Sequence, residues 1–295
     1  MKTSTRMLAI WVLISMAAAS APAADVPEMG PVRPRGSGGF NFALLPKAFQ
    51  TNPELEMTVV SEVTAHGRTL PEPRADAPVF YSLHDAGRHD RGELVAEHTT
   101  FSPGQFTPMV KKALAVRNYI AADTVPGARP TLQLVYHWGS FYRMDDEARQ
   151  QFPALARQQF VERAKLVRGS RYTSELVRRL EFGGVAKDFS TKSEHLDEQA
   201  INSLYFVIVS AYDYAALAHG ERKLAWRATM TVSAEGVALA ESLPPLILTA
   251  GDFFGRDMDS PELMLRNVRR GSVKFGEMEV IESGVTLPTP PPTSK

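Results

Sequence analysis

Cysteine is absent from all 295 residues of this sequence. Without a thiol, the chain cannot form disulfides, thiolate zinc sites or cysteine-ligated iron–sulfur clusters, and it has no cysteine nucleophile. It also lacks the cysteine that a bacterial lipoprotein needs for its lipid anchor. Its stability must therefore come from a packed core, and a chain with 44% apolar residues can bury a sizeable one.

A surplus of either charge is absent too, because 33 lysines and arginines balance 33 acidic residues. A near-neutral chain lacks the electrostatic footprint of a nucleic-acid-binding protein. It also lacks the polybasic character that draws a protein to anionic lipid. Two local basic clusters, at 168–179 and 266–270, are interrupted by apolar and polar residues, and we interpret them as solvated faces. We expect no nucleic-acid partner.

The most apolar stretch, residues 8–16 (LAIWVLISM), is shorter than the roughly 20 residues that cross a bilayer. Lys2 and Arg6 precede it, and the small residues of the segment 20–23 (SAPA) follow it. This order is typical of a secretory signal peptide. We predict a signal peptide at 1–23 with cleavage after Ala23, a periplasmic or secreted mature chain, and no transmembrane anchor after cleavage. The alternative is an uncleaved anchor.

Behind the signal, proline and glycine mark the ends of one large domain. Residues 24–53 are a Pro/Gly-rich leader, 54–284 are predicted to form a single α+β domain, and the tail 285–295 is expected to be disordered. Hydrophobic periodicity predicts a mixed or mainly antiparallel sheet of about five to seven strands, with helices packed on one face and a helical insertion at 140–203. The expected strands are 55–63, 79–83, 132–138, 204–214, 223–232, 263–268 and 272–281. The expected helices include 107–121, 154–168 and 239–254, and residues 84–104 are expected to form a loop.

Two segments give the clearest strand signals. Residues 204–214 (LYFVIVSAYDY) are almost continuously apolar, which is typical of a central strand covered on both faces. In 223–232 (KLAWRATMTV), Trp226, Ala228 and Met230 share one face at a period of two. Together these segments predict a β-hairpin with an enlarged loop.

Five short stretches resemble a family of bacterial exported domains of unknown function, most of them small cell-envelope lipoproteins. The stretches are 111–120 (KKALAVRNYI), 132–139 (LQLVYHWG), 206–213 (FVIVSAYD), 223–227 (KLAWR) and 240–254. The likeness spans about 105–255, roughly half of the chain. It implies an α+β domain in the envelope and no established catalytic residue. The missing lipidation cysteine, the long helical block and the extra C-terminal strands depart from the family pattern.

The sequence lacks the recognisable motifs of several enzyme classes. There is no His-Glu-x-x-His run of a metalloprotease and no Gly-x-Ser-x-Gly elbow of a serine hydrolase. We expect no cofactor. The hypothesis that follows is a non-enzymatic exported envelope protein that binds another protein or an envelope component; its oligomeric state stays open. The alternatives are a secreted hydrolase with an unrecognised site and a carrier of a small molecule or lipid.

Four residues are candidates for binding contacts. Trp226 and Arg227 carry the best match to the family. They are either structural, with the tryptophan packed inward and the arginine closing the hairpin edge, or an exposed pair that contacts a ligand. His137 and Trp138 end an expected strand, where they either line a pocket or form a half-buried edge of the core.

Metal binding is a weaker hypothesis, and we expect no metal site. His84, His89 and His98 lie in one polar loop, and imidazoles could hold zinc, but their spacing matches no zinc motif. A second cluster consists of Asp252, Asp257 and Asp259. Its oxygen ligands suit calcium, although the EF-hand spacing and central glycine are missing. The simpler interpretation of both clusters is a polar loop or turn.

Overall fold

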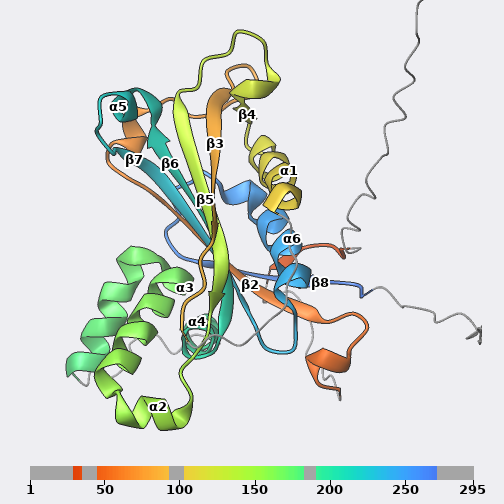
Figure 1. The fold of residues 1–295 in the computed structure, drawn as a ribbon, viewed down its shortest axis with the longest axis vertical. Helices are drawn as coiled ribbons and strands as arrows, with labels where there is room; N and C mark the ends of the chain where they lie inside the picture. Colours follow the sequence, from red (N-terminus) through yellow and green to blue (C-terminus); the bar gives the residue numbers. More distant parts are fainter. Residues whose placement is uncertain (1–28, 35–44, 93–102, 183–190, 271–295) are drawn as a thin grey trace, which may run out of the picture.

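The computed structural model describes residues 29–34, 45–92, 103–182 and 191–270, and its centre is an eight-stranded sheet (Figure 1). The strands lie in the order β1-β8-β2-β7-β6-β5-β3-β4. Their bounds are β1 (Arg33–Pro34), β2 (Glu54–Val63), β3 (Val79–Arg88), β4 (Tyr119–Ala121), β5 (Leu132–Phe141), β6 (Leu204–Asp213), β7 (Leu224–Ser233) and β8 (Glu262–Asn267). β3 runs parallel to β4 and β5, and the other neighbours are antiparallel. The predicted α+β class is confirmed.

The two strongest strand predictions are confirmed as β6 and β7. They pair in antiparallel register across the short helix α5 (Tyr214–Ala218), which forms the enlarged loop of the hairpin. β6 lies between β5 and β7, and buried side chains point to both of its faces, with Phe206 on one and Val207 on the other. The apolar run therefore marks a central strand, as expected.

Three expectations about the elements are wrong. The sheet has eight strands because the short β1 and β4 add to it. The helix expected at 107–121 is α1 (Pro103–Ala115); Asn118 then takes a left-handed φ of 58° and the chain enters β4. The loop expected from residue 84 begins later, because pairing with β5 extends β3 to Arg88 despite its polar sequence. The strand predicted at 272–281 lies outside the described residues.

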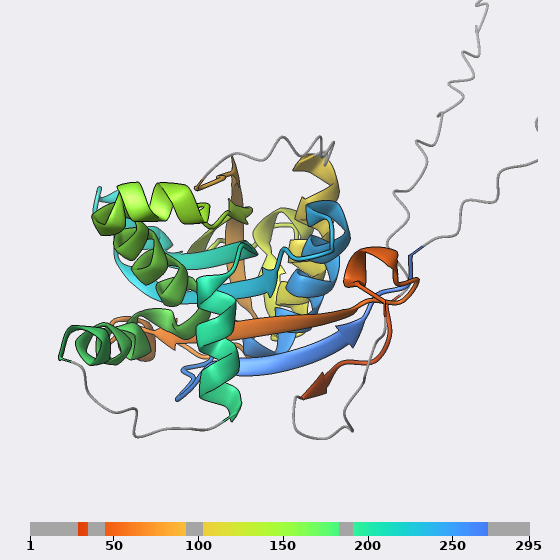
Figure 2. The same ribbon diagram turned by 90° about the horizontal axis from the view of Figure 1, so that it is seen from below.

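One face of the sheet carries the larger core. Helices α1 and α6 (Leu239–Thr249) contact each other on this face, and the one-turn helix η4 (Ala250–Phe253) follows α6. Figure 2 shows the two helices side by side, away from the insertion. Every second residue of β5 and β7 points into this core, as the period-two pattern of β7 predicts. The fully buried side chains here include Leu134, Tyr136, Phe106, Leu114, Met230, Leu246 and Phe254.

The helical insertion covers part of the opposite face. It consists of α2 (Asp146–Gln151), α3 (Pro153–Phe182) and α4 (Thr191–Ile201), which lie between β5 and β6 in the chain. A smaller core joins Phe141, Leu204 and Phe206 of the sheet to Ala164 and Leu196 of the insertion. The expected insertion at 140–203 is therefore present, and helices lie on both faces of the sheet rather than on one.

Polar contacts fasten the insertion to the sheet. α3 breaks at Gly169, whose φ of 80° is left-handed, and the Glu62 carboxylate then accepts from the backbone N–H groups of Ser170 and Arg171 at 3.2 and 3.1 Å. Arg168 is only 8% exposed and donates to the Ser193 carbonyl at 3.0 Å. The interpretation of 168–179 as a solvated face is therefore wrong for Arg168, which was expected to contact water and instead holds α4.

The second basic cluster holds part of the leader. Arg270 Nη1 donates to the carbonyls of Lys47 and Ala48 at 2.8 and 2.9 Å, beside the short helix η1 (Lys47–Phe49). Arg270 also pairs with Glu241 at the start of α6. Arg270 is therefore half-buried rather than solvated, and its guanidinium group supplies the donors for these backbone carbonyls. Among the described residues no helix is long and apolar enough to cross a membrane, and the predicted signal peptide lies outside them.

Candidate functional site

The connection between β5 and α2, Tyr142 to Asp145, separates two pockets beside the insertion. The larger has a volume of about 420 Å³ and the smaller about 240 Å³. Arg143 and Met144 line both of them. We call this pair of pockets the insertion cleft. Its walls come from segments that are far apart in the sequence, namely 142–163, 201–203 and 234–235.

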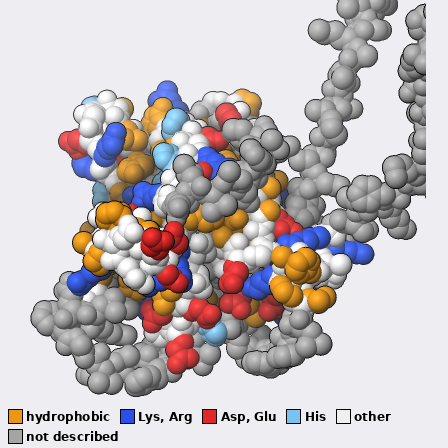
Figure 3. All heavy atoms as spheres, turned by 60° about the horizontal axis from the view of Figure 1, so that its bottom comes forward, with side chains coloured by type: hydrophobic (Ala, Val, Ile, Leu, Met, Phe, Trp, Pro, Cys, Tyr) orange, Lys and Arg blue, Asp and Glu red, His pale blue; other side chains and the backbone are white. Residues whose placement is uncertain are grey.

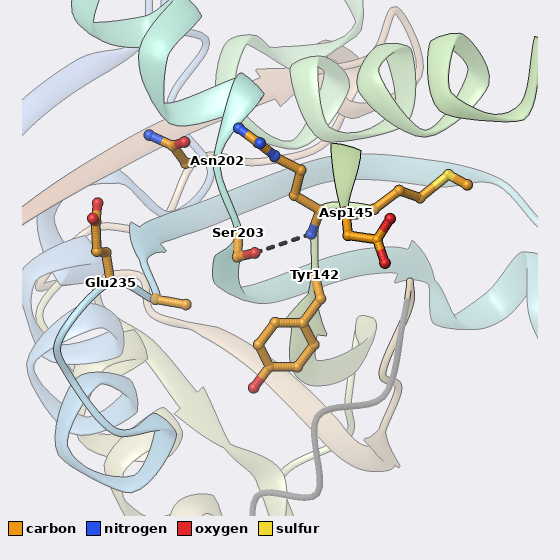
Figure 4. Close-up of a pocket in the computed structure, with 8 residues that line it drawn as sticks. Tyr142, Asp145, Asn202, Ser203 and Glu235 are labelled. Atoms are coloured by element: carbon orange, nitrogen blue, oxygen red, sulfur yellow. Dashed lines mark hydrogen bonds between the residues drawn. The ribbon is translucent and has the colours of Figure 1, made fainter. Parts of the chain in front are cut away.

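Hydrogen bonds hold the floor of the larger pocket (Figure 4). The backbone N–H of Arg143 donates to Ser203 Oγ at 3.0 Å, which joins the end of β5 to the start of β6. Asp145 Oδ1 accepts from the N–H of Ala148 at 2.6 Å and caps α2. Tyr142 and Glu235 also line this pocket. The segment from Tyr142 to Asp145 connects the end of β5 to the start of α2, and all four of its residues line the pocket.

Arginines dominate the smaller pocket: Arg143, Arg149, Arg157 and Arg163 all line it. Arg163 is 4% exposed, and its Nε donates to the Ala200 carbonyl at 2.9 Å. Its Nη1 is buried without a hydrogen-bond partner among the described residues. Burial, then the positive charges of Arg143 and Arg149, lower the pKa of Arg163 to about 10. The pocket is therefore positively charged, and no acidic side chain among the described residues neutralises the charge of Arg163.

Two of these arginines, Arg143 and Arg149, share one acidic partner. Asp146 Oδ1 accepts from Arg143 at 2.8 Å and from Arg149 at 3.0 Å, and the aspartate side chain is 74% exposed. No carboxylate of the described residues pairs with Arg163. Met144, Phe160 and Ile201 supply an apolar wall. The smaller pocket thus combines buried positive charge with apolar surface.

Negative charge collects on the other side of the cleft. A third pocket of about 170 Å³ shares Asn202 and Glu235 with the larger one and adds Glu56, His195 and Glu198. Figure 3 shows acidic side chains gathered over the middle of this face. Charge therefore changes sign between the arginines of the smaller pocket beside α3 and the carboxylates of this third pocket beside α4, where Lys47 is also present.

The structure separates the predicted pair Trp226 and Arg227. Successive side chains of β7 point to opposite faces, so Trp226 is buried under α6 and Arg227 is exposed on the other face. The indole lies 5.5 Å from the ring of Tyr119 and 5.9 Å from that of Phe254, between ring centroids. Arg227 Nε donates to Ser210 Oγ at 3.2 Å. The two side chains form no joint surface, and β7 is a central strand rather than an edge.

His137 and Trp138 are divided in the same way. Trp138 is 3% exposed, and its ring centroid lies 6.0 Å from that of Phe106 in α1. His137 points to the opposite face, where its ring lies 5.2 Å from His89 and 6.1 Å from Phe206. Burial, followed by the charges of His89, Arg227 and Arg91, lowers the pKa of His137 to about 4. Neither residue lines a pocket described here.

The candidate metal ligands do not gather. No three His, Asp or Glu side chains of the described residues lie together as a metal site. His84 lies in β3, His89 directly follows the end of this strand, and His98 lies outside the described residues. His84, Val135, Ser210, Arg227 and Glu62 occupy one row across five strands. Four strand spacings, about 19 Å, thus separate His84 from Glu62, next to which Asp257 binds the N–H of Val63. The two clusters therefore form no common site.

Asp252, Asp257 and Asp259 are all exposed, but Asp257 has a structural role of its own. The Asp257 carboxylate accepts from Arg68 at 2.5 Å and from Arg171 at 2.6 Å, which ties the second half of α3 to the segment that follows β2. Burial would raise the pKa of Asp257, but hydrogen bonds from Arg68, the Val63 N–H and Arg171 outweigh it and lower the pKa to about 2.

We expect Asp257→Asn to lower the free energy of unfolding at pH 7 by about 1 kcal/mol, because a partly exposed and screened ion pair is worth little more. A depressed pKa stabilises the fold above the ordinary value of 3.8, and this contribution is lost as the pH falls towards about 2. Urea unfolding at pH 7 and at pH 2 measures both effects, and the two proteins should converge at pH 2. Asp259→Asn is the matched control, and an equal loss in that variant would contradict the prediction.

Sequence reasoning missed the arginine-lined pocket. Its arginines come from separate elements and show no regular spacing. One signal was available: Arg163 occupies the same helical face as Phe160, Ala164 and Val167, which are apolar. A charged residue on an apolar face is unusual unless it has a partner.

Comparisons with known proteins assign the chain to no family. No family model and no curated protein matches it. Among solved structures, a dodecamer of a PelC variant from Paraburkholderia phytofirmans is similar at 10% identity with a TM-score of 0.29, covering 65% of this chain and 92% of that one. A PDZ domain protein from Parabacteroides distasonis gives 9% identity and a TM-score of 0.34, covering 75% of this chain and 40% of that one. Neither likeness is close enough to bear on function.

Proposed function

We propose that this chain is exported from the cytoplasm and works in the cell envelope as a non-enzymatic binding protein. The order of charged, apolar and small residues in 1–23 supports export. The resemblance over 105–255 supports the envelope. The insertion cleft is the binding site, and it holds an envelope component between the sheet and the helices of the insertion.

The observation that carries this proposal is the combination of hollow shape, buried charge and exposed apolar surface at one place. Ligand sites are typically concave and apolar, with a few polar groups that orient the ligand. Three large apolar side chains of the insertion, Phe152, Leu155 and Ile201, are 56%, 45% and 45% exposed. Ile201 lines the smaller pocket, and Phe152 and Leu155 flank it in the sequence of α2 and α3. Large apolar side chains next to a pocket favour binding over a purely structural role.

Blocking the cleft is expected to remove the bound component. Ala156→Trp fills the smaller pocket and Ala234→Trp fills the larger, since each alanine lines one of them. We expect one or both variants, purified as the mature chain from the native envelope, to retain about tenfold less of the component, a loss of about 1.4 kcal/mol in binding. Native mass spectrometry of the bound small molecules and proteins measures the occupancy.

The matched control is Ala115→Trp, at an exposed position of α1 on the other face of the sheet. It should keep the wild-type complement. An unchanged complement in all three variants would show that the cleft is not the site. A wild-type protein that carries nothing but hydrolyses envelope esters or glycosides would replace the proposal with the hydrolase alternative.

A further inference from the structure

Four arginines line the smaller pocket, and they come from three segments of the chain. Arg143 comes from the end of β5, Arg149 from α2, and Arg157 and Arg163 from α3. α3 also presents Gln159, whose side-chain amide can donate through Nε2. Guanidinium groups provide planar pairs of donors that fit the oxygens of phosphate or carboxylate. The donor set is therefore that of an oxyanion site.

Arg163 is the side chain that a structural role does not explain. Its exposure is only 4%, yet one terminal nitrogen lacks an acceptor in the part of the chain that the structure describes. A buried donor without a partner costs about 1–3 kcal/mol, and more when it is charged. Its other contacts, the Ala200 carbonyl and the ring of Phe141 at 5.2 Å, neutralise no charge. A bound anion would supply both the missing acceptor and the missing charge.

The size and the walls of the pocket limit the ligand further. Its volume of about 240 Å³ is below the roughly 300–1,000 Å³ of sites for whole drug-sized molecules. It therefore suits a head group. Met144, Phe160 and Ile201 form the apolar wall, and Ile201 extends it to the surface. The remainder of the ligand would leave the pocket along apolar side chains.

We propose that the arginine-lined pocket binds a phosphate-type oxyanion that is carried on a molecule with an apolar portion. Arg163 binds the oxyanion from the buried end, Arg149 and Arg143 close the solvent side, and Gln159 contacts an oxygen of the ligand. This inference rests on the proposed function, since it names the ligand of one pocket of the cleft.

Titration calorimetry of the full mature chain tests it with two soluble probes, inorganic phosphate and dihexanoyl phosphatidic acid, at constant ionic strength. We expect the short-chain lipid to bind about tenfold more tightly than phosphate, because only the lipid contacts the apolar wall. Arg163→Met should weaken both by at least about tenfold. Arg149→Met, at an exposed position that tolerates change, should weaken both by several-fold.

The control is Arg129→Met, an exposed arginine in the connection between β4 and β5, which should bind as the wild type does. Equal binding by wild type and Arg163→Met, or an equal loss in Arg129→Met, would overturn the proposal, because binding would then follow net charge alone. If neither probe binds while the purified chain still holds a component that Ala234→Trp releases, this inference fails and the proposed function stands. If the chain holds no component either, both fail.

Sedimentation with phosphatidylcholine vesicles, with and without phosphatidic acid, distinguishes the sources of the head group. Binding only to vesicles that contain phosphatidic acid, and its loss in Arg163→Met, assigns the site to a membrane lipid. Binding of the soluble probes without vesicle binding assigns it to a free phosphorylated amphiphile. Vesicle binding that persists in Arg163→Met would count against the pocket.

Discussion

Replacing Trp226 by alanine is expected to lower the free energy of unfolding by about 3–5 kcal/mol, the usual cost of deleting a buried large aromatic side chain. The indole is 3% exposed and packs between Tyr119 and Phe254. It projects from β7, which pairs with both β2 and β6. The cavity would open at the centre of the larger core, where neighbouring strands leave little freedom to collapse. Urea unfolding followed by circular dichroism measures the loss.

Arg227→Ala is the sharpest comparison, because it changes the next residue of the same strand. Arg227 lies exposed on the opposite face, and its side chain makes one hydrogen bond to the described residues, with Ser210. Its loss should cost less than about 1 kcal/mol. Comparable losses in the two variants, or a Trp226→Ala protein as stable as the wild type, would contradict the assignment of Trp226 to the core. The pair thus tests the structural interpretation of the residues that carry the family resemblance.

The same comparison explains what the resemblance conveys. Its stretches include Tyr119, Tyr136, Trp138 and Trp226, and all four are at most 3% exposed. Apolar residues at fixed places in strands report how a core is packed. They say little about a site, since function resides in surface groups that the fold positions. Membership of the envelope family stays a prediction, and the residues that support it predict a fold rather than a ligand.

The elements that the sequence predicts well are those whose signal is local. One apolar run predicts β6 and one alternating segment predicts β7, because the order of consecutive residues indicates which faces of a strand are buried. The extension of β3 to Arg88 is not local: it depends on parallel pairing with β5, a strand that comes much later in the chain. Gly139 of β5 allows this approach, since a Cβ at that position would lie 2.1 Å from the His89 carbonyl oxygen. The polar end of β3 is therefore a strand because it pairs with β5.

The candidate site is harder to predict for the same reason. Arg143 and Arg163 are 20 residues apart, and Ile201 joins them only after the insertion folds back onto the sheet. The pattern of 145–182 predicts helices, and it is confirmed by α2 and α3. It does not predict the contact between those helices and the start of β6. The candidate ligands at 84–98 and 252–259 are close together in the sequence, yet the sheet separates His84 on β3 from Asp257, which binds the N–H of Val63 on β2.

His137 gives the second large effect, as a loss of stability in mild acid. Its pKa of about 4 lies below the ordinary 6.5, so the unfolded chain takes up the proton first. The stability is complete above pH 6.5 and falls as the pH drops towards 4. The full shift would correspond to about 3 kcal/mol. Because the imidazole is partly accessible to solvent, we expect about 2 kcal/mol between pH 7 and pH 4.

Other groups titrate over the same range, so the informative quantity is the difference between proteins. His137→Gln should lose about 2 kcal/mol less than the wild type between pH 7 and pH 4 in urea unfolding. His84→Gln, an exposed position on the same face, should lose as much as the wild type. An identical pH dependence of wild type and His137→Gln would contradict the prediction.

The charges that disfavour protonation of His137 belong to His89, Arg91 and Arg227, and an acidic partner placed against them would raise the pKa of His137 again. A steep loss in acid would therefore show that this face of the sheet carries no such partner in the isolated chain.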